Sequence, residues 1–130
     1  MTYTTATISM LPSEFIDEIE KVLLEGGWVR NNFGPAGVRS DPHCLFGAAR
    51  CVELEQRVAA SPYFLPFETV KRDVLTAIVD AIKRKFNVQV EVGVDLALCI
   101  TYFNDLMAKS VDDVMDVLHD ARLALKEQGK

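Results

Sequence analysis

The sequence predicts a mostly α-helical protein: a single compact domain of about five helices around a buried helix near residues 94–107, with at most a minor short β element. Three observations support this fold class. Apolar residues recur at the three- and four-residue spacing of helices along most of the chain. Residues that start and stop helices separate these segments. The 130 residues, 49% of them hydrophobic and 25% charged, have the length and composition of one globular domain.

The first 12 residues are expected to form an extended N-terminal arm, and residues 13–127 a single helical domain. Thr, Tyr and Ile in the arm favour an extended conformation. Ser13, after Pro12, is expected to be the N-cap of the first helix, and the pair Gly26-Gly27 to end it. The apolar face of this helix consists of Phe15, Ile16, Ile19, Val22 and Leu23.

The next segment, residues 28–40, is rich in Asn, Gly and Pro and predicts a compact loop. Trp28, the only tryptophan, is expected to anchor this loop rather than to bind a ligand. Asp41-Pro42 predicts the start of a second helix that continues to about Val58. Its small side chains form a stripe that another helix can approach closely: Cys44, Gly47, Ala48 and Cys51.

A third helix is predicted from about Phe67 to Phe86. Its basic end, residues 83–85, complements the helix dipole, and we prefer this interpretation to a phosphate site. Valines alternate with polar residues at 87–92, which predicts a strand. Residues 3–8 are its candidate partner.

The segment 94–107 is apolar on nearly all sides, which is typical of a helix buried in the centre of a core. Ser110 and Asp113 resemble a capping box that opens an amphipathic last helix. The apolar face of that helix is formed by Val111, Val114, Met115, Leu118, Ala121 and Leu125.

The charge balance narrows the class of partner. The 14 Lys and Arg residues against 19 Asp and Glu residues give a net charge of -5, which argues against nucleic-acid binding. The chain has no apolar run long enough for a membrane span, and its N-terminus does not resemble a signal peptide. Three cysteines without a CxxC motif favour a reducing compartment. We therefore expect a cytoplasmic protein without a cofactor or membrane association, with a protein partner, and with a homo-oligomer as an option.

Candidate catalytic residues are few. No spacing of His and Cys matches a zinc site, so no metal is expected. Cys44 lies near a predicted helix N-terminus, which favours a thiolate, and His43 is adjacent. Asn104 or Asp105 could orient a histidine. Against catalysis, Asp41 raises the thiol pKa, neighbouring residues of a helix do not face each other, and Cys44 lies on the apolar side. The catalytic residues therefore stay unknown, with Cys44, His43 and Asp105 as the candidates.

The pair Asn104-Asp105 has two interpretations. Asn and Asp side chains at the end of a helix commonly bond backbone groups of a turn or a neighbouring loop, and we favour this structural role. In the functional interpretation, Asn104 and Asp105 face the loop that contains Trp28 and form a small binding site with it.

Several short motifs resemble a family of uncharacterised small proteins, a domain of unknown function, from actinobacteria and their phages. They are Gly27-Trp28 after the first helix, DPHCLFGA at residues 41–48 with its C-x-x-GA pattern, and YFND at residues 102–105. The family has Trp where this chain has Phe103, and Thr where it has Ser110. The resemblance implies a small helical cytoplasmic protein and no known activity. The positions to test are Trp28, Cys44, Gly47, Ala48, Asn104 and Asp105.

Three functions compete at this point. The first is a small soluble accessory protein, more an interaction protein than an enzyme, that binds a protein partner through the acidic exterior of its first and last helices or through an apolar patch between them. The second is a small cysteine-dependent hydrolase or transferase that uses Cys44, which requires an exposed and reactive thiol. The third is a self-assembling helical protein.

Overall fold

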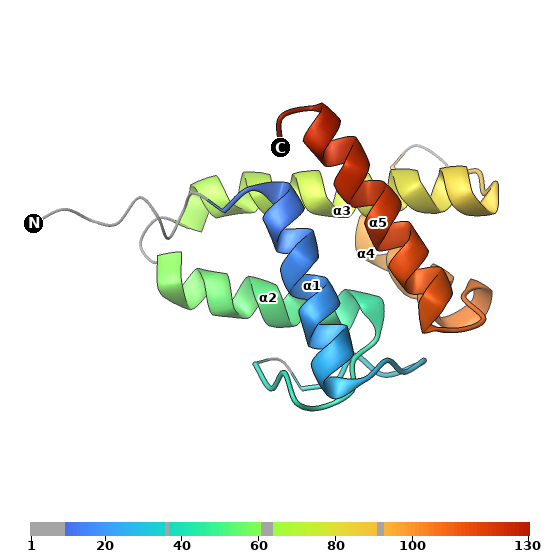
Figure 1. Cartoon of the computed structure of the whole chain (residues 1–130), viewed down its shortest axis with the longest axis horizontal. Helices are drawn as coiled ribbons and strands as arrows, with labels where there is room; N and C mark the ends of the chain where they lie inside the picture. The colour runs from blue at the N-terminus through green and yellow to red at the C-terminus, as the bar shows by residue number, and fades with distance from the viewer. Residues whose placement is uncertain (1–9, 36, 61–63, 91–92) are drawn as a thin grey trace, which may run out of the picture.

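The computed structural model describes residues 10–35, 37–60, 64–90 and 93–130 (Figure 1). Its elements are α1 (Pro12–Gly26), α2 (Leu45–Ala60), α3 (Phe64–Phe86), α4 (Leu96–Tyr102), the π-helical turn η2 (Phe103–Met107) and α5 (Val111–Glu127). This arrangement confirms the predicted all-α fold class of five helices. Within the described ranges, β structure is limited to an isolated parallel bridge between Trp28 and His43.

The helices form two layers. In Figure 1, α1 and α5 run side by side in front of α2, α3 and α4. Helix α1 contacts α2, α3 and α5, and α4 contacts α2 and α3. The largest fully buried side chains come from all five α-helices and the π turn: Phe15, Phe103, Ile16, Ile19, Leu23, Leu45, Ile78, Ile82, Ile100, Leu118 and Leu125. None of the described helices is long and apolar enough to cross a membrane.

Helix α1 begins one residue before the expected N-cap. Pro12 is its first residue, and the carboxylate of Glu14 accepts a 2.8 Å hydrogen bond from the Leu11 N–H. Ser13 is buried, and its N–H and hydroxyl both donate to the carbonyl oxygen of Lys130. Ser13 therefore joins the start of α1 to the end of the chain instead of capping the helix. The predicted arm lies outside the described residues up to residue 9.

Helix α2 begins at Leu45, three residues after Pro42, the expected first helical residue behind an Asp41 N-cap. The preceding residues are held by the loop that follows α1. Three backbone hydrogen bonds make this connection: His43 N–H to Gly27 O, Val29 N–H to His43 O, and Cys44 N–H to Asn32 O. Because the His43 carbonyl oxygen accepts from the loop, it is not available as an acceptor for a helical turn before Leu45.

The segment 94–107 shows the largest departure from expectation. Its inner face is buried through Ile100, Phe103 and Asn104. On its outer face Leu98 is 63% exposed and Leu106 is 68% exposed. The expectation that this helix is buried on all sides is wrong, because α4 packs on α2 and α3 from one side and no described element covers the other side.

Two other expectations changed in detail. Residues 88–90 are not part of a strand, and the remainder of the expected pairing, residues 91–92 and 3–8, lies outside the described residues. At the start of α5, Asp113 accepts a 2.8 Å hydrogen bond from the Lys109 N–H. The Ser110 side chain makes no capping bond. The Asp113 carboxylate therefore bonds the N–H of Lys109, whereas in a capping box it would bond the N–H of the next residue, Ser110.

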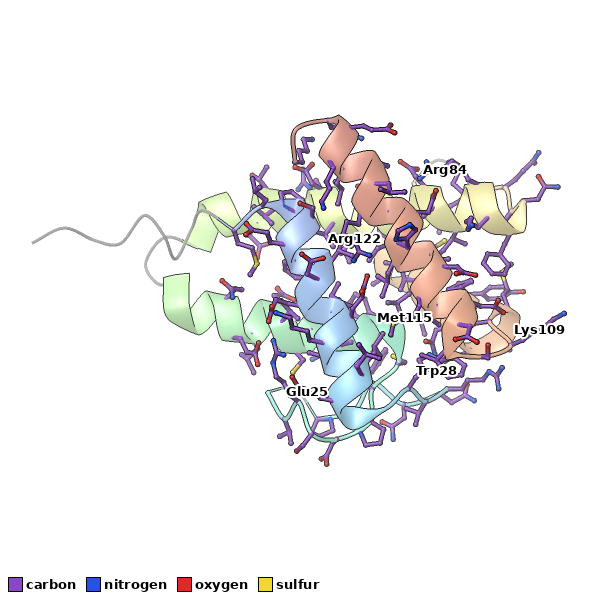
Figure 2. All side chains as sticks on the ribbon, viewed as in Figure 1. Glu25, Trp28, Arg84, Lys109, Met115 and Arg122 are labelled. Atoms are coloured by element: carbon purple, nitrogen blue, oxygen red, sulfur yellow. The ribbon has the colours of Figure 1, made fainter. Side chains whose placement is uncertain are left out.

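Ion pairs join helices both within a layer and between the two layers. Arg122 of α5 pairs with Asp17 and Glu20 of α1, and Arg84 of α3 pairs with Asp120 of α5 at 2.6 Å. Figure 2 shows Arg84 beside α5 and Arg122 on the α5 ribbon next to α1. Some carboxylates of the first and last helices thus form ion pairs with arginines of the same chain.

Candidate functional site

Asn104 makes four hydrogen bonds from a fully buried position at the π turn. Its Oδ1 accepts from the Trp28 indole N–H at 2.5 Å and from the Leu45 N–H at 2.9 Å. Its Nδ2 donates to the Val29 carbonyl oxygen at 3.1 Å and to the Asp105 carboxylate at 2.9 Å. An amide side chain has two acceptor and two donor positions, so Asn104 uses all of them.

These bonds connect three segments that lie far apart in the sequence. We call Trp28, Cys44, Asn104 and Asp105 the Asn104 cluster. Besides the bond from Asn104, the Asp105 carboxylate accepts a second hydrogen bond, from the Asn31 N–H to Oδ1 at 2.8 Å. Asn31 has a φ of 60°, a left-handed conformation that Asn adopts more readily than most residues. The cluster therefore holds the loop after α1, the start of α2 and the π turn in one arrangement.

Cys44 precedes α2 and caps its first turn. Its Sγ accepts a hydrogen bond from the Gly47 N–H at 3.3 Å, while Asn104 satisfies the Leu45 N–H. These are two of the N–H groups that the first turn of a helix leaves unpaired. A Cβ added at Gly47 would lie 1.8 Å from the carbonyl oxygen of Phe33, so the loop can approach this helix only at glycine. The C-x-x-G pattern thus has a structural explanation.

The π turn lets two consecutive residues face the core. The Ala108 N–H bonds the Phe103 carbonyl oxygen at 2.9 Å, a five-residue spacing that widens the turn. Phe103 then packs edge-on against Phe86 with ring centroids 4.9 Å apart, while its neighbour Asn104 is also buried. Such single π turns occur frequently at functional sites, but here the turn positions a structural amide.

Trp28 has a polar and an aromatic role in the cluster. Its indole N–H bonds Asn104, and the Arg30 guanidinium lies 5.1 Å from its ring centroid. Arg30 also donates to the carbonyl oxygen of Ala108, directly after the π turn. In the view of Figure 2, Trp28 lies between the end of α1 and the beginning of α5. These contacts match the anchoring role that we favoured for Trp28 over ligand binding.

His43 is fully buried beside the loop. Its Nε2 lies 2.9 Å from the Pro35 carbonyl oxygen, and its Nδ1 has no hydrogen-bond partner among the described residues. In the same part of the chain, no hydrogen bond joins the His43 ring to Cys44 or to Asp105. Cys44 and Asp105 line the same cavity, but His43 bonds Pro35 instead, and the three candidate catalytic residues form no nucleophile–base–carboxylate relay.

Cys44 has an environment that favours the protonated thiol. The side chain is 1% exposed, and this burial raises the pKa of the thiol. The Asp105 carboxylate raises the pKa further, whereas the Gly47 N–H lowers it. Cys44 forms part of the wall of a cavity of about 220 Å³, together with Asn31, Asn32, Phe33, Thr101 and Asp105. Because a nucleophile requires an accessible thiolate, this geometry gives the cysteine-enzyme alternative no support.

Metal-ligating side chains do not converge either. Across the described ranges, no three His, Cys, Asp or Glu side chains are grouped so that they could hold a metal ion.

The most unusual surface of the molecule is the outer side of α4 and η2. Four apolar side chains follow one another at four-residue intervals, and we call them the α4 stripe: Val94, Leu98, Tyr102 and Leu106. They are 38%, 63%, 57% and 68% exposed. The sequence pattern missed this surface, because a segment that is apolar on all sides predicts burial and does not reveal which side lacks a cover.

A groove lies on each side of the stripe, and Leu98 lines both. The first has a volume of about 400 Å³ between α4 and residues 88–90, with Ile82, Val90, Cys99, Phe103 and Met107 in its apolar wall. The second has about 390 Å³, and its wall contains Phe33, Phe46, Asp95, Ala97 and Thr101. Leu98 of the stripe thus lies between the two grooves.

Comparison with known protein families gives one match. A family model described as a family of unknown function, DUF6197, matches residues 8–123. This match confirms the resemblance to an uncharacterised domain family at that level. Comparisons with curated proteins and with solved structures found no match.

Substitution of Asn104 should destabilise the fold strongly. Asn104→Leu keeps the approximate size of the side chain but leaves the Trp28 indole N–H, the Leu45 N–H and the Val29 carbonyl oxygen without their partner. We expect the free energy of unfolding, measured by urea denaturation, to fall by about 3 to 5 kcal/mol. The matched amide-to-leucine control Gln128→Leu, at an exposed position, should change it by less than about 0.5 kcal/mol. A loss below about 1 kcal/mol for Asn104→Leu would contradict the structural role of the cluster.

Alkylation should discriminate between a structural and a catalytic Cys44. Because burial raises the pKa of its thiol, we expect iodoacetamide to leave Cys44 unmodified in the folded protein at pH 7 to 8 and to modify it in urea. Cys99, which is partly exposed, is expected to react first, as read by peptide mass spectrometry. Modification of Cys44 in the folded protein at pH 7, faster than that of a free thiol, would revive the cysteine-enzyme alternative.

Proposed function

Since the chain belongs to the DUF6197 family, whose function is unknown, we propose that it is a non-enzymatic interaction protein that binds another protein chain through the α4 stripe. The observation that carries this proposal is the exposure of Leu98, Tyr102 and Leu106 on one helical face. Exposed apolar side chains are common singly, whereas a contiguous row between grooves is typical of protein interfaces. Tyrosine is also among the residues that contribute most to binding at interface centres.

The structure of α4 supports the same conclusion. This helix has seven residues, which is too short to be stable without packing, and its inner face is already buried against α2 and α3. Its outer side chains contribute less to that packing, since Leu98, Tyr102 and Leu106 keep more than half of their surface exposed. Burial of an exposed leucine stabilises a complex by about 1.5 to 3 kcal/mol. A partner that covers the stripe therefore gains binding energy that the fold itself leaves unused.

The acidic exterior of α1 and α5, our other candidate surface, is less suited to a partner. Several of its carboxylates are engaged by arginines of the same chain: Arg122 pairs with Asp17 and Glu20, and Arg39 pairs with Glu18. A basic partner would have to compete with these internal pairs. The proposal therefore assigns the binding surface to α4.

The remaining parts of the proposal concern the setting. From the resemblance to actinobacterial and phage proteins, we propose that the chain originates from such a genome and acts in the cytoplasm, in the host cytoplasm if it is phage-encoded. The three free cysteines are consistent with a reducing compartment. Trp28, Asn104 and Asp105, our earlier candidates for a binding site, act in this proposal by holding α4 in place.

Photo-crosslinking tests the proposed surface. We expect a p-benzoylphenylalanine residue at position 98 to form covalent adducts with another protein chain on irradiation in cells of the source organism. The same residue at position 24 is the matched control, because Leu24 is 73% exposed but belongs to α1. Adducts can contain a second copy of the chain or a different protein, and either supports the proposal. Equal adduct formation at positions 98 and 24, or none at either, would overturn it.

A further inference from the structure

We propose that the chain that covers the α4 stripe is a second copy of this protein, packed antiparallel about a two-fold axis at Tyr102. This inference rests on the proposed function and adds the identity of the partner. It is carried by the spacing of the exposed residues, by the charges at the two ends of the stripe, and by the grooves that flank it.

Along the sequence, the exposed residues of this segment are spaced symmetrically about Tyr102. Asp95, Leu98, Tyr102, Leu106 and Lys109 are all exposed and follow one another at intervals of three, four, four and three residues. In a two-fold interface each surface position meets its mirror position on the partner. Antiparallel pairing at Tyr102 therefore places Leu98 opposite the Leu106 of the second copy and Asp95 opposite its Lys109.

The charges at the ends of the face complement each other in the same arrangement. Asp95 lies before α4 and uses Oδ1 to cap the Leu98 N–H at 3.2 Å. Lys109 lies on the turn before α5 (Figure 2). Within the described ranges neither side chain forms an ion pair. A second copy in antiparallel orientation would give each of them an opposite charge, and a two-fold dimer would contain this pair twice.

The surface has the shape that self-association requires. Helices pack by inserting a ridge of side chains spaced four residues apart into the groove of a neighbour. Leu98 and Tyr102 are exposed side chains at this spacing, and the grooves of about 400 Å³ and 390 Å³ lie on the two sides of Leu98. With a two-fold axis at Tyr102 the exposed apolar side chains of the two copies meet, and the grooves beside Leu98 leave space for side chains of the second copy. An interface with these properties buries apolar surface at its centre and leaves charged residues at its rim, as stable interfaces do.

A charge-exchange experiment with the full chain tests this arrangement. Sedimentation equilibrium of the wild type is expected to show a dimer, with twice the 14.5 kDa mass of the chain, that dissociates on dilution. Asp95→Lys and Lys109→Asp are each expected to weaken self-association about tenfold or more, since both pairs in the dimer become repulsive. In a mixed dimer of the two variants, position 95 of each copy again faces an opposite charge at position 109 of the other. The mixture should therefore associate more strongly than either variant alone, although Asp95→Lys also removes the cap on the Leu98 N–H.

Recovery in the mixture cannot arise from variants that fail to fold, so it separates the interface from stability. Gln128→Leu, at an exposed position outside the face, should dimerise like the wild type. If the wild type stays monomeric up to about 200 µM, the partner that covers the stripe is not a second copy. This concentration lies far above the dissociation constants of typical specific complexes. A dimer whose association is unchanged by both charge reversals, or a mixture that associates no more strongly than either variant alone, would overturn it equally. Crosslinks from position 98 to a different protein would in each case leave the proposed function standing.

Discussion

The buried amide of Asn104 joins the π turn to the loop after α1 and to the start of α2, and the positions of these three segments depend on its hydrogen bonds. Trp28, Val29 and Leu45 lie 76, 75 and 59 residues from it in the sequence. Bringing such distant segments together costs chain entropy, which the bonds and the packing around them must offset. Each of these groups would also be costly to bury without a partner. The arrangement is therefore cooperative: when Asn104 is displaced, the loop, the start of α2 and the π turn all lose a bond together.

This constraint explains why α4 exposes apolar residues. The π turn directs both Phe103 and Asn104 inward, toward Phe86 and toward the loop with Trp28. The inner side of the segment is thereby fixed, and the side chains four residues apart on its outer side remain in solvent. Residues that the resemblance marked for testing thus hold the scaffold, whereas the surface available to a partner consists of other residues. The scaffold and the proposed binding face are two sides of the same short segment.

Much of the fold could be predicted from local patterns, and the errors came from contacts between distant residues. Helices α1 and α5 have one apolar and one charged face, so periodicity located them well. The start of α2 was placed too early because its caps come from Cys44 and from Asn104, 59 residues away. The structural role of Asn104 was favoured from its residue type, but its partners could not be identified. The exposure of Leu98 was missed because a pattern that is apolar on all sides does not show which side lacks a neighbour.

The most direct test of the central role of Asn104 is hydrogen exchange measured by NMR on the native protein. The Trp28 indole N–H and the Leu45 amide N–H both donate to Asn104 Oδ1. If the cluster holds the fold together, both protons exchange only on global unfolding, with the same free energy and the same denaturant dependence. The Leu98 amide, in the short exposed helix, serves as a comparison. Rapid exchange of the Trp28 and Leu45 protons while core amides of α5 stay protected would contradict this account.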